Sequence, residues 1–338
     1  MNDQNPAAAP AEPSPAPYKD RSAGLVVFGI LTLLLGVLAG LVILLVLVGQ
    51  AAAANLPNPP PRAATLLPVI AVYGTLAVAL VWLGIGSIMA RRWARALLLI
   101  FSWSWLVMGV FTIGILGFVM PKVLANLPPN ATNGQPALPA GAIVGVMIVM
   151  FLVFGVLFVI LPAVWTFFYN SPHVKATCES RDPVTRWTDA CPLPVLGLCL
   201  WLSFAVPMML LMPIAAHGTM PFFGMFLTGL PGSVFCIFIA VVWSYAAWRL
   251  YRLDVRGWWL ILIALVVFMV SSVLTYARHD VVEMYQLMGY PEAQIEQIKQ
   301  TGLLQGNRMS WFMVLSVLPF LGYLLFIKKF LHGKAGGS

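Results

Sequence analysis

Long apolar runs separated by short polar stretches dominate the sequence. Each run is close to the ~20 residues that a helix needs to cross a hydrocarbon core of ~30 Å. None alternates with the period of two that is typical of a transmembrane β-barrel. We therefore expect an all-α integral membrane protein with eight transmembrane helices, near 24–48, 66–90, 96–120, 141–168, 193–215, 223–247, 257–276 and 310–327.

Prolines lie within several of these runs, at Pro68, Pro162, Pro207 and Pro319. In a membrane helix a proline either kinks the helix or marks an unwound binding segment, and kinks are the expectation here. The Ala/Pro-rich stretch 1–22 has no periodicity and predicts a disordered cytoplasmic tail. The first apolar run is too long for a signal-peptide core, so we expect it to be retained as a helix.

Composition supports this class. Hydrophobic residues make up 61% of the chain and charged residues 9%, against about a quarter charged in soluble proteins. The net charge of +8 has no basic stripe on a soluble face to carry it, so nucleic-acid binding is not expected. None of the eight predicted cores contains Asp, Glu, Lys, Arg or His, which argues against proton-coupled transport and acid–base catalysis within the membrane.

Basic residues gather on one side of the predicted helices. That side carries 14 of the 19 Lys and Arg residues, namely Lys19, Arg21, Arg91, Arg92, Arg95, Lys175, Arg181, Arg186, Arg249, Arg252, Arg256, Lys328, Lys329 and Lys334. The opposite side has Arg62, Lys122, Arg278, Lys299 and Arg308. By the positive-inside rule both termini are cytoplasmic, as an even number of spans requires.

Matches at a constant offset of 161 residues suggest an internal duplication. Trp82, Arg91 and Arg95 correspond to Trp243, Arg252 and Arg256. We expect two tandem four-helix repeats of parallel topology. They would span 23–169 and 193–330, with a cytoplasmic loop at 170–192 between them and a short tail at 331–338. The rival explanation is that aromatic-belt and charge rules place a Trp and an Arg at any cytoplasmic turn.

The Trp-x8-Arg-x3-Arg hairpin, with its Arg91-Arg92-Trp93-Ala94-Arg95 turn, resembles a turn found in many uncharacterised multi-pass proteins of bacterial inner membranes. The resemblance covers the second and third spans and their counterparts, the sixth and seventh. It implies a bacterial inner (plasma) membrane and carries no function with it.

The arginines of the two turns are candidate lipid-headgroup ligands, because cationic side chains at that level attract anionic lipids. They are Arg91, Arg92, Arg95, Arg249, Arg252 and Arg256. Five tryptophans lie beside the basic clusters: Trp93, Trp187, Trp248, Trp258 and Trp259. We interpret them as an aromatic belt that needs no ligand.

The cytoplasmic loop 170–192 contains three candidate zinc ligands, His173, Cys178 and Cys191. No Cys-x2-Cys knuckle is present and no fourth ligand is evident. A linker tied by Arg–Asp pairs and anchored by Trp187 is therefore favoured, and no cofactor is expected. A disulfide between the two cysteines is not expected in a reducing cytoplasm.

The segment 278–308 carries most of the charge on the outer side. Apolar residues recur at helical spacing from Val281 to Met288 and again after Pro291, which predicts two short amphipathic helices over the second repeat. The corresponding loop of the first repeat, 121–140, is proline-rich. The outer segment is therefore a candidate cap for a partner or ligand, with candidate residues Asp280, Glu283, Tyr285, Glu292 and Glu296.

No motif for nucleophilic, metal or phosphate chemistry is present, so an enzyme is not favoured. The leading hypothesis is a non-enzymatic scaffold, accessory subunit or sensor, which an exposed small-residue face at Gly29, Gly36 and Gly40 would support. The alternative is a transporter or lipid-handling protein for a neutral or lipid-like substrate. Its cavity would be lined by Ser203, Thr228, Ser233, Ser271 or Ser272. A membrane enzyme or metal/redox protein using loop 170–192 is the third hypothesis.

Overall fold

Long apolar helices make up most of the protein. The computed structural model describes residues 18–53, 66–125, 140–300 and 308–331, and within them eight helices are long and apolar enough to cross a membrane. They are α1 (Ser22–Ala53), α2 (Leu67–Ile88), α3 (Arg92–Ala125), the α4–α5 helix, α7 (Leu193–Ala215), α8 (Gly229–Tyr251), α9 (Val255–Tyr276) and α12 (Arg308–Leu331). The α4–α5 helix runs from α4 (Ala140–Gly155) through a π-helical turn, η2 (Val156–Ile160), into α5 (Leu161–Asn170). The chain is a multi-pass helical membrane protein.

Short elements lie at both ends of these helices. At one end are α6 (Pro172–Arg181) and a 3₁₀ turn, η3 (Trp187–Asp189). At the other are two strands, β1 (Met220–Phe222) and β2 (Met225–Leu227), and the helices α10 (Val281–Leu287) and α11 (Glu292–Gln300). The predicted start of the sixth span at 223 is wrong, because the strands occupy that stretch and α8 begins only at Gly229. Residues 1–17 of the predicted N-terminal tail and residues 332–338 of the predicted C-terminal tail lie outside the described residues.

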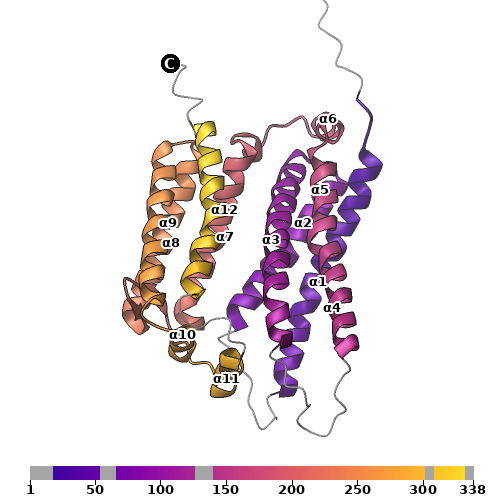
Figure 1. The fold of residues 1–338 in the computed structure, drawn as a ribbon. Coiled ribbons are helices and arrows are strands. Elements are labelled where there is room, and N and C mark those ends of the chain that lie inside the picture. Colours follow the sequence, from indigo (N-terminus) through magenta and orange to yellow (C-terminus); the bar gives the residue numbers. More distant parts are fainter. Residues whose placement is uncertain (1–17, 54–65, 126–139, 301–307, 332–338) are drawn as a thin grey trace, which may run out of the picture.

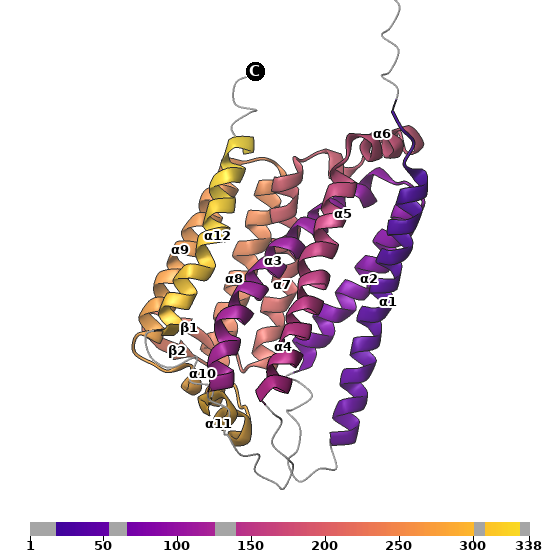
Figure 2. The same cartoon turned by 45° about the vertical axis from the view of Figure 1, so that its right-hand side comes forward.

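The eight helices form two groups of four that stand side by side (Figures 1 and 2). In the first group α1 packs on α2, α2 on α3, and α3 on the α4–α5 helix. In the second group α7 packs on α8, α8 on α9, and α9 on α12, which returns to contact α7. Helix α7 joins the groups, because its Leu200 packs against both buried cores and its Trp201 Nε1 donates to Ser104 Oγ at 2.8 Å.

Glycines bring α1 and α2 unusually close together. A Cβ added at Gly29 would lie 2.9 Å from the Gly84 carbonyl oxygen, and one at Gly36 would lie 2.9 Å from Val81 N. Farther along α1, Gly40 faces Ala77. The small-residue face of α1 is therefore covered by α2, and it is not the exposed docking face that the scaffold hypothesis expected.

The four prolines lie at different positions in their helices. Pro68 lies in the first turn of α2, where the missing N–H costs no helical hydrogen bond, so no kink arises there. Pro162 is the second residue of α5, so it comes one residue after the π-helical turn η2. Pro207 and Pro319 lie inside α7 and α12 as predicted, and both helices continue through them.

The two turns that carry the matching arginines, α2–α3 and α8–α9, do not align at the offset found in the sequence. Each has one left-handed residue just after the first helix, Ala90 (φ 52°) and Leu253 (φ 59°). When the turns are aligned on these two residues, their offset is 163. Arg91 then follows the left-handed residue of its turn, whereas Arg252 precedes that of the other turn, so the two arginines are not equivalent. The tandem duplication stays a prediction.

Candidate functional site

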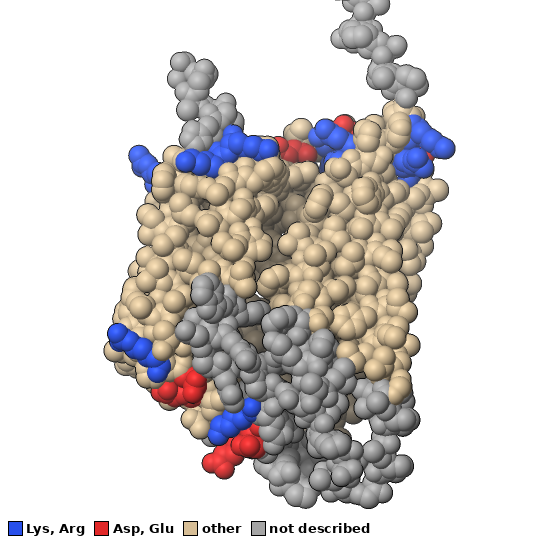
Figure 3. All heavy atoms as spheres, in the orientation of Figure 1, with Lys and Arg blue, Asp and Glu red and all other residues tan. Residues whose placement is uncertain are grey.

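The end of the bundle that carries α6 is called the basic side here, because Lys and Arg line its rim (Figure 3). Helices α1 and α12 respectively begin and end there, and an apolar belt separates this rim from the sparser charges at the opposite end (Figures 1 and 3). Helix α6 lies across the first group and is tied to the segment just before α1. The Tyr18 hydroxyl donates to Ser180 Oγ at 2.8 Å, and Arg21 N donates to Thr177 Oγ1 at 3.2 Å.

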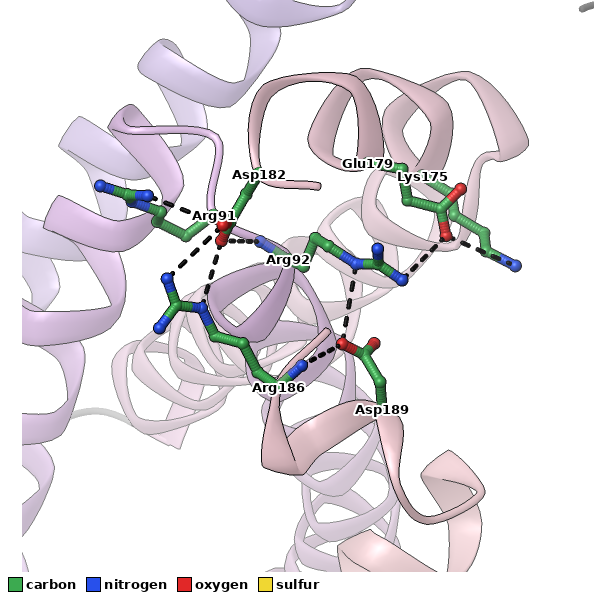
Figure 4. Close-up of polar contacts among 7 residues, drawn as sticks. All are labelled: Arg91, Arg92, Lys175, Glu179, Asp182, Arg186 and Asp189. Atoms are coloured by element: carbon green, nitrogen blue, oxygen red, sulfur yellow. Dashed lines mark hydrogen bonds and ion pairs between the residues drawn. The ribbon is translucent and has the colours of Figure 1, made fainter. Parts of the chain in front are cut away.

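A buried carboxylate organises the loop on the basic side (Figure 4). The Asp182 side chain is 3% exposed and faces Arg91 at 3.7 Å and Arg186 at 3.4 Å. It also accepts from the backbone N–H of Arg92 at 3.4 Å. Two guanidinium groups share this one carboxylate, so the cluster keeps a net positive charge.

A second pair of acidic residues holds the side chain of Arg92 (Figure 4). Its guanidinium lies 3.6 Å from Glu179 and 3.6 Å from Asp189. Nearby, Arg95 Nε donates to the Tyr169 carbonyl at 3.1 Å. The predicted linker tied by Arg–Asp pairs is confirmed, and much of it is the ordered helix α6.

The six arginines proposed as lipid ligands therefore divide into two sets. Arg91 and Arg92 are engaged with the protein's own loop, and Arg95 with the end of α5, as described above. In the second group, Arg249 pairs with Asp254 at 2.7 Å, and Arg252 lies over the Trp248 ring at 4.2 Å. Only Arg252 and Arg256 have exposed side chains.

The candidate zinc ligands do not converge. Cys178 belongs to the core of the first group, Cys191 belongs to that of the second, and the His173 ring accepts from Lys19 N at 3.4 Å. Burial raises the pKa of the Cys178 thiol to about 11, so little of the thiolate needed for nucleophilic attack is present at neutral pH. Among the described residues no three His, Cys, Asp or Glu side chains gather to hold a metal ion.

A pocket of about 320 Å³ opens beside this loop on the basic side. It is lined by Trp82 of α2, Trp93 of α3, and four loop residues: Val184, Thr185, Arg186 and Trp187. The rings of Trp82 and Trp93 are stacked, with centroids 4.1 Å apart. Three indoles and one guanidinium therefore meet at a single concave surface.

At the opposite end, the β1–β2 hairpin is held by hydroxyls of α9. Ser271 Oγ accepts from Phe223 N at 2.9 Å, and Thr275 Oγ1 accepts from Gly224 N at 3.1 Å. These two turn residues both have positive φ, 41° and 95°, as in the tight turn that suits the twist of a two-residue hairpin. Ser271 is thus used to hold the hairpin.

The hairpin and residues 278–300 together form the cap over the second group. His279 joins its two parts, because its Nδ1 lies 2.8 Å from Glu283 Oε2 and its Nε2 lies 3.1 Å from the Gly224 carbonyl oxygen. The two predicted amphipathic helices are confirmed as α10 and α11: Val281 and Ile295 are buried.

A pocket of about 780 Å³ lies at the junction of α9 and α10. It is lined by Tyr276, Ala277, Arg278, His279, Asp280, Val282, Glu283 and Gln286. Of the predicted cap residues, Asp280 and Glu283 face this pocket. Tyr285 packs edge-on against Tyr290, and Glu292 and Glu296 are exposed on α11.

Two features of these sites were missed in the sequence: the hairpin and the tryptophan pocket. The hairpin had a local signal, since Phe223-Gly224 lies between the short apolar segments Met220–Phe222 and Met225–Leu227. The pocket had none, because its walls come from α2, α3 and a distant loop.

Comparison with known proteins found no matching family model, no matching curated protein and no matching solved structure. Functional inference therefore rests on the residues of this chain.

Proposed function

We infer that this chain is a non-enzymatic accessory subunit or sensor of a bacterial inner membrane, with the cap as its binding surface. The observation that carries this inference is the pocket of about 780 Å³ in the cap. Its walls combine a cation, Arg278, with the carboxylates of Asp280 and Glu283. Such a mixed lining suits a polar or zwitterionic group on a soluble ligand or a partner protein.

The order of the cap supports a binding role. Backbone and side-chain bonds from α9 and His279 hold the hairpin, and burial of Val281 and Ile295 anchors α10 and α11. Ordering such segments costs roughly 1–2 kcal/mol per residue of backbone entropy, which the buried contacts must offset. A preformed pocket binds a ligand without paying that cost again.

The alternative hypotheses have less support. Neither pocket described above is lined by Ser203, Thr228, Ser233, Ser271 or Ser272, the residues expected around a transport cavity. An enzyme that used loop 170–192 would need reactive groups there, but Cys178 is 1% exposed and its burial raises its thiol pKa.

Site-specific photocrosslinking in living bacteria tests the cap. A benzophenone amino acid at Gln286, which is exposed and lines the pocket, should give a discrete adduct. The matched control places the same group at Val241, which is 61% exposed on α8 within a span and should give only lipid adducts.

The pocket itself is tested by replacing its carboxylates. Asp280→Asn combined with Glu283→Gln should remove the Gln286 adduct, whereas Glu179→Gln on the basic side should leave it intact. If Gln286 yields the same lipid adducts as Val241, the cap is not a binding surface and the inference fails.

A further inference from the structure

The tryptophan pocket on the basic side has the chemistry of a lipid site, and this inference is independent of the function of the cap. We propose that Trp82, Trp93, Trp187 and Arg186 bind one anionic glycerophospholipid, with its phosphate at Arg186 and its apolar body against the indoles. This replaces the site of six arginines expected from the sequence, since most of those side chains are engaged within the protein.

The apolar floor of the pocket is preformed. Trp82 and Trp93 stack with an interplanar angle of 22°, and the Trp93 ring can pack closely against α2 because Gly86 has no side chain. A Cβ at Gly86 would approach the Trp93 ring to 2.6 Å. Trp82 nevertheless stays 51% exposed, so the platform presents an indole face outward.

The third indole closes the other wall of the pocket. Trp187 is 45% exposed, and its backbone carbonyl accepts from the Tyr251 hydroxyl at 3.0 Å. That bond ties the loop to α8, so the wall is positioned from the second group while the floor belongs to the first. An isolated belt tryptophan needs no such support, which distinguishes this cluster from ordinary interfacial indoles.

The charge at the pocket selects an anion. The six lining residues include Arg186 and no carboxylate. Arg186 uses Nε and Nη2 toward Asp182, which leaves Nη1 for a phosphate oxygen. Because Arg91 faces the same carboxylate, Asp182 does not neutralise both cations. A cationic headgroup, which an aromatic cage alone would accept, would be repelled here.

The position of the pocket points to the membrane as the source of the anion. Trp82 lies on the transmembrane helix α2, within two turns of its basic-side end, and Arg186 lies in the loop above it. The pocket therefore spans the level at which a phospholipid changes from acyl chain to phosphate. A soluble phosphate would satisfy Arg186 but would leave the three indoles without an apolar partner.

Native mass spectrometry of the full-length protein in detergent tests the site, with phosphatidylglycerol as the probe. Trp187→Ala should weaken binding about fivefold, the change expected for one lost aromatic contact. Arg186→Gln should weaken it at least as much, and Arg186→Lys should restore part of the loss. Trp187→Ala leaves the ion pairs of Asp182 untouched, so its effect does not depend on refolding of the loop.

The second group offers a matched control. Trp248 and Arg252 form an exposed aromatic–cation pair on the same rim, with the guanidinium 4.2 Å from the ring, but neither lines the pocket. Trp248→Ala and Arg252→Gln should therefore leave phosphatidylglycerol binding unchanged. Equal losses in these controls would overturn the proposal, because binding would then follow total surface charge.

Two further probes separate the lipid from other anions. Phosphatidylethanolamine, which has no net charge, should bind more weakly than phosphatidylglycerol. Glycerol 1-phosphate carries the anion without acyl chains and should not compete at comparable concentration. If glycerol 1-phosphate displaces phosphatidylglycerol with equal affinity, or if Trp187→Ala has no effect, the pocket is not a phospholipid site.

Discussion

A single buried carboxylate, Asp182, holds the neighbouring arginines in contacts within the protein. Its side chain is 3% exposed, and a carboxylate buried to that extent needs charge partners and hydrogen-bond donors. Arg91, Arg186 and the backbone N–H of Arg92 supply them. The sequence predicted the position of these arginines at the basic rim and pairing within the loop. It did not show that Asp182 would be buried, because burial depends on how α6 folds over α3.

Asp182→Asn should destabilise the basic side by about 1–3 kcal/mol, since it leaves two guanidinium groups without their shared counter-charge. The two arginines are 35% and 38% exposed and can regain water, which keeps the loss below that of a fully buried pair. A lower thermal unfolding temperature in detergent would report it. Glu296→Gln is the control, because Glu296 is 61% exposed and should change stability little. Equal shifts for the two variants would show that the buried carboxylate has no special role.

At the level of elements, the lengths of the apolar runs predicted the positions of the membrane-spanning helices well. They predicted the segments that connect these helices poorly. The predicted span 193–215 coincides with α7. The thickness of the membrane fixes how many consecutive apolar residues a spanning helix needs, and that number can be read from the sequence. The sixth span was placed too early because Phe223 and Met225 are as apolar as a helix core, although they lie in the hairpin turn and in β2. Hydropathy does not register the hydroxyls of Ser271 and Thr275, which give that hairpin its backbone partners.

Replacing these hydroxyls should release the hairpin and leave the spans intact. Ser271→Ala with Thr275→Val removes the acceptors of Phe223 N and Gly224 N. The loss should cost about 1–3 kcal/mol at the buried Gly224 bond and less at Phe223, which is 47% exposed. Hydrogen–deuterium exchange should rise at 222–225. Ser244→Ala is the control, because Ser244 Oγ donates only to Ala240 O one turn earlier in its own helix. Unchanged exchange in the double variant would mean that other contacts hold the hairpin.

For the whole molecule, the two groups share the same order of neighbouring helices but differ at both ends. The first group carries α6 on the basic side, and the second carries the cap at the other end. The turns also correspond at 163 residues while the Trp and Arg matches fall at 161. Belt and charge rules act on each turn separately and can produce such matches without common ancestry, so helix order is the stronger support for the predicted duplication.

The orientation of the molecule in its membrane is the last prediction: the basic side faces the cytoplasm and the cap faces outward. It rests on the concentration of Lys and Arg along one rim (Figure 3). Val184→Cys, 61% exposed on the basic side, and Gln286→Cys in the cap provide one accessible thiol each. The four native cysteines are buried and none is in a disulfide, so they should contribute little background. An impermeant maleimide should label Gln286→Cys in intact spheroplasts, and Val184→Cys only after permeabilisation. The reverse labelling pattern would mean that the protein has the opposite orientation in the membrane. Labelling of both thiols from outside would contradict the eight-span topology.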